Sequence, residues 1–347
     1  MYTKKIILGI SLLTASACYK VEPIEISVPQ REIDTQALTQ YKANLHNRNI
    51  TMGMLYNWTN ETGSFLMRTP DSLDVIVLKD SYENISETQK NDLQAVQQKK
   101  ATKVLVGLNM DAIAKAYETQ KETEIANKQK EIEANKNLTT PEEKEKQINA
   151  AISEITERLS AIAKENIAKQ GENILQIAKN NGFNGISIEF PMVLKDPFNE
   201  ENFNGMLANI VANKGNLLLV VENPYGERGF TSDVKPIDAA DWIVYYKKNN
   251  ELYKSFSDLA QKFTLSRFLP STDFSEETLI DGFSDSTAFD PDGKNGKYPR
   301  TTGLLYWTAS NKKGVALYHI EKDFHNLAGK NTYKNLRSII NKLQAKK

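Results

Sequence analysis

The chain has 347 residues, 40% of them hydrophobic and 25% charged, and its formal net charge at pH 7 is zero. This composition supplies enough apolar material for one large core, or for one core with an appendage. The neutral balance gives no electrostatic reason to expect a nucleic acid as partner, because a basic face is the usual footprint of proteins that bind one.

The N-terminal residues have the features of a targeting segment and contribute nothing to the predicted fold. Lys4 and Lys5 precede an apolar run from Ile6 to Leu13, which is too short to span a bilayer as a helix. Small residues at positions 15–17 lead to Cys18, the only cysteine, so no intrachain disulfide can form. The arrangement resembles a bacterial lipoprotein signal, which implies removal of residues 1–17, lipidation of Cys18 and an outer-membrane, cell-surface location. The alternative is an ordinary cleaved signal followed by a free thiol.

The segment from residue 18 to residue 45 is predicted to be a tether. Between Tyr19 and Ala43 it has prolines, polar breaks and little hydrophobic periodicity. The folded domain is therefore expected to comprise residues 46–347.

From Asn49 onward, apolar runs typical of buried strands alternate with helical patterns. The helix after the second run begins with a capping box, in which Ser86 precedes Gln89 by three residues. No Gly-x-Gly-x-x-Gly follows the first run, which removes the usual signal of a dinucleotide site. The alternation predicts an α/β fold, a closed (β/α)8 TIM barrel rather than an open doubly wound sheet. The eight runs are 50–58, 73–78, 104–108, 186–190, 217–221, 242–246, 263–268 and 315–320.

Roughly 75 residues separate the third and fourth runs, where a barrel helix needs about 15 to 20. Thr140 and Glu143 form a capping box with Pro141 at the first helical position. Isoleucine or leucine then recurs at positions 148, 152, 155, 159 and 162, a narrow seam like that of a coiled coil. Residues 111–135 are the predicted partner helix, with the tip at 136–139. We therefore expect a long helical hairpin inserted at about 113–165.

Two functions are open for this hairpin. Because its seam is thin and its outer faces are charged, it can be a solvated spacer. It can also be a docking arm for a partner protein.

The stretch from Asn181 to Met192 is the most informative part of the sequence. Its apolar alternation predicts a buried strand, and Gly182 and Gly185 allow a tight turn before it. The stretch resembles the fourth barrel strand of family 18 glycoside hydrolases, whose pattern is Asp-Gly-x-Asp-x-Asp-x-Glu. The four acidic positions of that pattern fall on Asn184, Ser187, Glu189 and Pro191.

Three other stretches resemble the same family at their strand ends. The first strand closes as Gly-Met-Leu-Tyr-Asn-Trp at residues 53–58, and the eighth places Tyr318 where the family has a tryptophan under the central sugar. In the sixth, Tyr246 falls at the family's tyrosine and Lys247 at its aspartate. The resemblance spans most of the chain from Asn49 to Phe324 outside the hairpin.

The resemblance implies a substrate-assisted mechanism, in which the sugar's N-acetyl oxygen attacks and no protein nucleophile is needed. The family's last acidic position donates the proton to the leaving oxygen, and Pro191 has none to give. Residues 187, 189 and 191 lie on one face of the strand. Glu189 keeps a carboxyl there, but about 6 to 7 Å below the donor position. It can bind an acetamide or be a structural acid, for which Lys247 is a candidate partner.

We therefore predict that the protein is not an enzyme but a surface lipoprotein that binds N-acetylglucosamine-containing glycans, such as host N-glycans. Aromatic rings with nearby amide and hydroxyl groups suit the faces and rims of sugars. No metal site is assigned, because the three histidines are scattered, and no cofactor is expected. The glycan-binding candidates are Asn57, Trp58, Glu189, Glu222, Asn223, Tyr245, Tyr246, Trp307 and Tyr318.

The resemblance also implies partners, namely an endoglycosidase and an outer-membrane importer of the starch-utilisation type. One alternative is an active endo-β-N-acetylglucosaminidase that uses a relocated acid, with Glu222 at the end of the fifth strand as the candidate. Another is a scaffold protein that acts through its helical arm.

Overall fold

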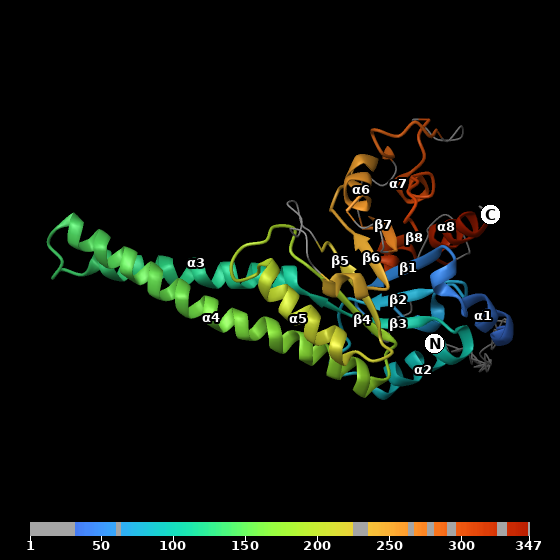
Figure 1. Cartoon of the computed structure of the whole chain (residues 1–347), viewed down its shortest axis with the longest axis horizontal. Helices are drawn as coiled ribbons and strands as arrows, with labels where there is room; N and C mark the ends of the chain where they lie inside the picture. The colour runs from blue at the N-terminus through green and yellow to red at the C-terminus, as the bar shows by residue number, and fades with distance from the viewer. Residues whose placement is uncertain are drawn as a thin grey trace, which may run out of the picture. The chain divides into compact units, whose positions relative to one another are not determined.

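The computed structural model describes residues 32–59, 64–224, 235–262, 267–275, 281–289, 296–324 and 332–345. Within them, eight parallel strands follow one another in chain order and close into a barrel, with β1 paired to both β2 and β8 (Figure 1). The predicted TIM barrel is confirmed. The strands are β1 (Ile50–Leu55), β2 (Val75–Leu78), β3 (Lys103–Asn109), β4 (Gly185–Glu189), β5 (Leu218–Glu222), β6 (Trp242–Tyr245), β7 (Phe268–Asp273) and β8 (Gly314–Tyr318).

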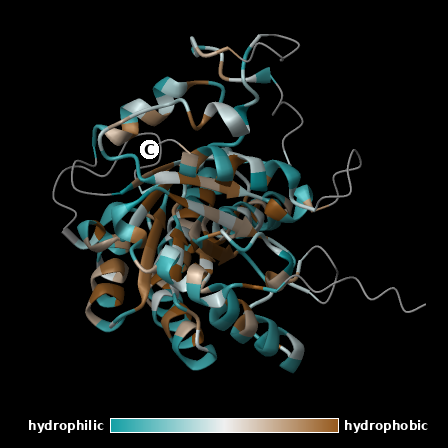
Figure 2. Cartoon of the chain, turned by 90° about the vertical axis from the view of Figure 1, so that its right-hand side faces the viewer, coloured by the Kyte–Doolittle hydropathy of each residue, from teal (hydrophilic) through white to brown (hydrophobic). Residues whose placement is uncertain are grey.

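Helices cover the outer side of the barrel, and none among the described residues is both long and apolar enough to cross a membrane. Their outer sides are hydrophilic, while the strands at the centre are hydrophobic (Figure 2). The helices are α1 (Thr35–Lys42), α2 (Glu87–Lys100), α3 (Met110–Ala134), α4 (Pro141–Asn181), α5 (Glu200–Asn213), α6 (Tyr253–Ala260), α7 (Arg300–Gly303) and α8 (Lys334–Ala345).

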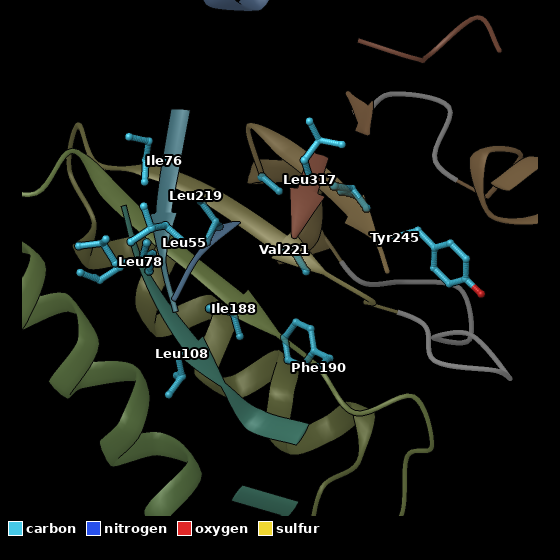
Figure 3. Packing of buried hydrophobic residues seen from close by; sticks show 14 of the residues in the cluster. Leu55, Ile76, Leu78, Leu108, Ile188, Phe190, Leu219, Val221, Tyr245 and Leu317 are labelled. Carbon is cyan, nitrogen blue, oxygen red and sulfur yellow. The ribbon is translucent and has the colours of Figure 1, made fainter. Parts of the chain in front are cut away.

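Alternate residues of each strand form two separate apolar layers. In β2, Val75 and Val77 face the interior of the barrel, where the packing includes Met52 and Leu105. Their neighbours Ile76 and Leu78 face the helices instead (Figure 3). The same alternation decides which residues at the end of each strand reach the mouth of the barrel, the term used here for the C-terminal ends of the strands.

The seventh strand lies five residues later than predicted. The expected run was 263–268, but β7 covers Phe268–Asp273, and residues 263–266 lie outside the described residues. The prediction was wrong because β7 contains Pro270 and ends in Ser, Thr and Asp. Proline normally argues against a central strand, and polar residues hide its hydrophobic alternation.

The start of the folded domain also differs from the prediction. Cys18 and residues 1–31 lie outside the described residues, but residues 35–42, placed in the tether, form helix α1. The ammonium of Lys42 is buried and donates to the carbonyls of Asp71 and Leu73 and to the hydroxyl of Thr102, at 2.7 to 2.8 Å. These contacts join α1 to the barrel, so the fold begins about twelve residues before position 46.

The inserted hairpin is present between β3 and β4, where α3 and the first half of α4 run side by side (Figure 1). Both predicted capping boxes are formed, at Ser86 for α2 and at Thr140 for α4. The seam differs from the prediction at one position. Ile162 is exposed, and Ala163 takes its place in the buried seam, because α4 passes from the partner helix to the barrel wall.

The two glycines before β4 serve different purposes. Gly182 ends α4 with a left-handed backbone, at φ 74°, and so allows the predicted turn. Gly185 needs no special conformation. It is required because a Cβ there would lie 2.4 Å from the carbonyl oxygen of Leu218 on β5.

Candidate functional site

A buried ammonium group organises the polar side chains at the mouth of the barrel. Lys79, directly after β2, donates to Glu189 of β4 at 2.8 Å and to both carboxylate oxygens of Glu222 of β5, at 2.8 and 2.9 Å. Glu222 also accepts from Ser187 at 2.7 Å and from the phenol of Tyr318. These five residues, the lysine cluster, occupy inward-facing positions and close the barrel above its apolar interior.

Charge pairing dominates this cluster. Burial alone would lower the pKa of Lys79, but the carboxylates of Glu222 and Glu189 outweigh it, so the pKa rises and the ammonium stays charged. Burial raises the pKa of Glu189; Lys79 opposes this effect and Glu222 adds to it. The side chain of Glu189 is 12% exposed and that of Glu222 is fully enclosed. Glu189 is therefore the carboxyl of the cluster that a ligand in the mouth can reach.

A second polar cluster surrounds Asp273 at the end of β7. Its carboxylate accepts from the phenol of Tyr246 at 2.7 Å and from the backbone of Ser275, also at 2.7 Å, and lies 2.8 Å from Nδ1 of His319. Burial would raise the pKa of Asp273, but the hydrogen bonds from His319, Tyr246 and Ser275 prevail and lower it to about 2. The carboxylate therefore stays ionised and fixes both rings.

Two stacked aromatic pairs complete the mouth. Tyr56 stacks on His319 with ring centroids 3.9 Å apart and an interplanar angle of 8°. Tyr246 stacks on Tyr318 at 4.0 Å and 19°. Tyr56, Tyr246 and His319 are partly exposed, whereas Tyr318 is fully buried. The exposed members offer flat faces of the kind on which sugars stack.

A polar hollow of about 620 Å³ lies beside the lysine cluster, at the ends of β1 and β2. Lys79 contributes to its wall, together with side chains that offer carboxylate, hydroxyl and amide groups. These are Thr59, Asp80, Ser81, Glu83, Asn84, Ser86 and Gln89. The size and the polar lining suit a small hydrophilic ligand.

The structure brings several predicted site residues together. Glu189, Glu222 and Tyr318 belong to the lysine cluster, and Tyr246 joins this cluster to Asp273. Asn223 follows Glu222 at the end of β5, where its side-chain oxygen accepts from the backbone of Tyr246 at 2.8 Å and holds β5 against β6. Asn57 is exposed at the edge of the mouth, and its backbone donates to Asp80 at 2.6 Å.

Three predicted aromatic contacts do not face the mouth. Trp58 is 1% exposed and donates to Asp92 of α2, since the left-handed turn at Asn57 ends the alternation of β1. Trp307 packs beside α6 and donates to Ser257, and Tyr245 is an outward residue of β6 against the same helix. All three belong to the core between strands and helices, and Trp58 also contributes to the lining of the polar hollow.

The other positions of the acidic motif are structural in this chain. The side-chain oxygen of Asn184 accepts from the backbone of Val104 at 2.9 Å and from Gln97 at 3.0 Å, which ties β4 to β3. Ser187 donates to Glu222. Pro191 lies just beyond the end of β4, two residues after Glu189.

Sequence reasoning missed four residues of the site, namely Tyr56, Lys79, Asp273 and His319. Lys79 is the partner of Glu189, and the exposed Lys247 proposed for that role is not. Counting inward positions along β1 and β2 would have found Tyr56 and Lys79, because they continue the series 52, 54 and 75, 77. Among the described residues, no three His, Cys, Asp or Glu side chains are grouped so that they could hold a metal ion.

Residues 22–164 match the family described as glycoside hydrolase family 18, BT1044-like. The chain resembles family 18 glycoside hydrolases. A search of curated proteins found no match to the sequence.

Solved structures show the same fold. A selenomethionine form of BT1044 with a Glu-to-Gln substitution is 15% identical and has a TM-score of 0.58, over 89% of this chain and 93% of that one. The family 18 chitinase ChiB from the chitin utilization locus of Flavobacterium johnsoniae is 12% identical with a TM-score of 0.50, over 86% of this chain and 94% of that one. At these identities the likeness concerns the fold alone.

Proposed function

We propose that this protein binds N-acetylglucosamine-containing glycans, such as host N-glycans, at the mouth of its barrel and does not hydrolyse them. The observation that carries the proposal is the state of the remaining acids. Glu189 is ion-paired with Lys79 at 2.8 Å. By the resemblance of the fourth strand, Pro191 falls at the family's donor position, and Glu189 is the nearest carboxyl on that face.

Hydrolysis needs a carboxylic acid within hydrogen-bond reach of the leaving oxygen. Glu189 lies one inward position, about 6 to 7 Å, short of that point. Glu222 is fully enclosed, and its oxygens already accept from Lys79, Ser187 and Tyr318. Neither acid is placed to protonate a leaving group, which supports binding without turnover.

Binding is supported by the groups that remain accessible. Tyr56 and Tyr246 supply ring faces, Glu189 supplies a carboxylate that can accept from an acetamide N–H, and the adjacent hollow is lined by polar side chains. The stacked partners and Asp273 hold the rings in place before a ligand arrives, which reduces the entropy lost on binding.

The proposed cellular setting rests on the N-terminal sequence. Cys18 is the proposed lipid attachment point, which would hold the domain at the outer membrane with its mouth free to take up glycans. The proposed partners are an endoglycosidase and an importer of the starch-utilisation type, to which the captured glycan is passed. Replacing Cys18 by alanine should move the protein from the membrane fraction to the soluble fraction.

An active endo-β-N-acetylglucosaminidase is the second candidate. Burial raises the pKa of Glu189, which is the direction that a general acid requires. This candidate requires the leaving oxygen to lie about one inward position deeper than in the family, next to Lys79. Glu222, the acid named from the sequence, is not available for that role.

Binding and turnover should be measured on the same samples of purified protein. Biantennary and high-mannose N-glycans and chitin oligosaccharides are offered, and both retained ligand and released product are followed. The proposal expects retention without product, with retention weakened at least tenfold by Tyr56→Ala and Tyr246→Ala. The control Lys99→Ala, on the exposed end of α2, should bind like the wild type.

Release of product that Glu189→Gln abolishes would establish an enzyme and overturn the proposal. A folded protein that neither retains nor cleaves any of these glycans would also overturn it, and would favour a scaffold that acts through the arm.

A further inference from the structure

A groove of about 450 Å³ lies at the base of the arm, beside the mouth of the barrel. Its walls begin where β3 and β4 end side by side, at the pair formed by Asn109 and Glu189. One wall is the first turns of α3, and the other is the segment after β4. We call it the arm-base groove, lined by Ala114, Glu118, Pro191, Met192, Val193 and Phe198.

The floor of this groove is aliphatic rather than aromatic. Val193 is 53% exposed, and Ala114 and Met192 are partly buried beside it. The ring of Phe198 is only 3% exposed, because it packs on Tyr117 with centroids 5.5 Å apart. The groove therefore offers no open ring face to a sugar, in contrast to the stacked tyrosines of the mouth.

The rim of the groove carries both signs of charge. Lys115 and Lys195 stand beside Asp111, Glu118 and Glu122. An aliphatic floor with a rim of mixed charge is suited to a polypeptide, whose apolar side chains can enter the floor while its amides and charged groups meet the rim. A purely apolar ligand would leave these charges desolvated and unpaired.

The dimensions fit a short extended peptide. The α3 wall runs from Asp111 to Glu122, which at 1.5 Å per residue is about 17 Å. An extended chain covers that length with about five residues. The groove begins two residues from Glu189, so a ligand in the mouth and a peptide in the groove would lie end to end.

We propose that the arm-base groove binds the polypeptide that carries the glycan, so that the natural ligand is a glycopeptide or glycoprotein segment rather than a free sugar. The inference rests on the proposed glycan binding at the mouth. In this proposal the base of the arm forms one wall of a second binding site.

The test compares three ligands on the intact protein: a free N-glycan, the same glycan on the asparagine of a pentapeptide, and the pentapeptide alone. The glycopeptide should bind roughly tenfold more tightly than the free glycan, a difference of about 1.4 kcal/mol. Val193→Asp should abolish this difference and leave the affinity for the free glycan unchanged. Ile162→Asp, at an exposed aliphatic residue of α4, is the matched control and should change neither affinity.

The two proposals fail in different ways. Equal binding of free glycan and glycopeptide by the wild type would overturn the peptide site and leave glycan binding intact. Loss of free-glycan binding by Val193→Asp, in a folded protein, would likewise overturn it, since the groove would then hold sugar. If the free glycan does not bind, the proposed function is overturned. The peptide site would still be supported if the bare pentapeptide binds and Val193→Asp weakens that binding. If none of the three ligands binds, both proposals are overturned.

Discussion

Lys79 and Glu189 form an ion pair of 2.8 Å at the mouth of the barrel, although 110 residues separate them in the sequence. The same ammonium binds Glu222, so one positive charge is shared by two carboxylates in a site that water hardly reaches. The free energy of unfolding should therefore depend on this pairing of charges at the mouth.

Replacing Lys79 by methionine should lower the free energy of unfolding by about 3 to 5 kcal/mol, because it leaves two buried carboxylates without their counter-charge. Burial already raises the pKa of Glu189, and without the opposing ammonium its folded-state pKa lies further above the unfolded value. The missing stability should therefore be larger at pH 8 than at pH 5. Urea unfolding at both pH values measures the effect.

Lys247→Met is the control for this variant, since Lys247 is exposed and should change the stability by no more than about 0.5 kcal/mol. Adding Glu222→Gln to Lys79→Met should restore part of the loss, because one unpaired charge is removed. If wild type and Lys79→Met were equally stable, Lys79 would not stabilise the two carboxylates of the lysine cluster.

Asp273 also makes a pH-dependent contribution to the free energy of unfolding, but this contribution is lost as the pH falls rather than as it rises. Its folded pKa of about 2 lies below the ordinary value of 3.8, so the unfolded chain binds more protons between these pH values. The contribution, about 2 kcal/mol, is complete above pH 4 and is lost as the pH falls through 2. Asp273→Asn should flatten the change of stability over this range, whereas Asp258→Asn, in an exposed helical pair, should not. Parallel acid-unfolding curves for wild type and Asp273→Asn would refute the assignment.

The barrel and its arm were predictable because local sequence encodes them. Alternating apolar residues identify most strands, and the capping boxes at Ser86 and Thr140 fix where two helices begin. The seventh strand was misplaced, since Pro270 and the polar ending from Ser271 onward hide its alternation.

The site was harder to predict, because it depends on which strand ends meet. Lys79 follows β2 and is succeeded by Asp80 and Ser81, a pattern typical of an exposed turn. Its burial comes from Glu189 and Glu222, which lie 110 and 143 residues away in the sequence. Trp58, also beyond the end of a strand, packs against α2 through Asp92 and still contributes to the lining of the polar hollow.

Replacing each of two helical glycines by alanine should change the free energy of unfolding in opposite directions. A Cβ at Gly171 of α4 would lie 2.6 Å from the side chain of Met206 on α5, so Gly171→Ala should destabilise the protein by about 1 to 3 kcal/mol. Gly205 of α5 has nothing within 4 Å of such a Cβ, and Gly205→Ala should stabilise by up to about 1 kcal/mol. Thermal unfolding of both variants distinguishes close packing of these helices from a loose contact, which would make both substitutions stabilising.

The outer part of the arm should be removable. Glu124 of α3 and Arg158 of α4 form an ion pair across the hairpin, so the chain can be rejoined there by replacing residues 125–157 with a loop of about four residues. The groove residues Ala114, Glu118 and Val193 and the mouth all remain. We expect cooperative unfolding and an unchanged affinity for glycan and glycopeptide, while assembly with a partner that docks on the outer arm would be lost.

This excision separates the two interpretations of the arm more sharply than a point variant. The outer segment buries little besides its own seam, so its removal should lower the helical circular dichroism without lowering the melting temperature by more than a few degrees. If the shortened protein stays folded but no longer retains glycan, the ligand lies on the outer arm and the mouth is not the site. If retention persists and pull-down of the importer or endoglycosidase fails, the outer arm recruits the partner while the barrel and the arm-base groove hold the ligand.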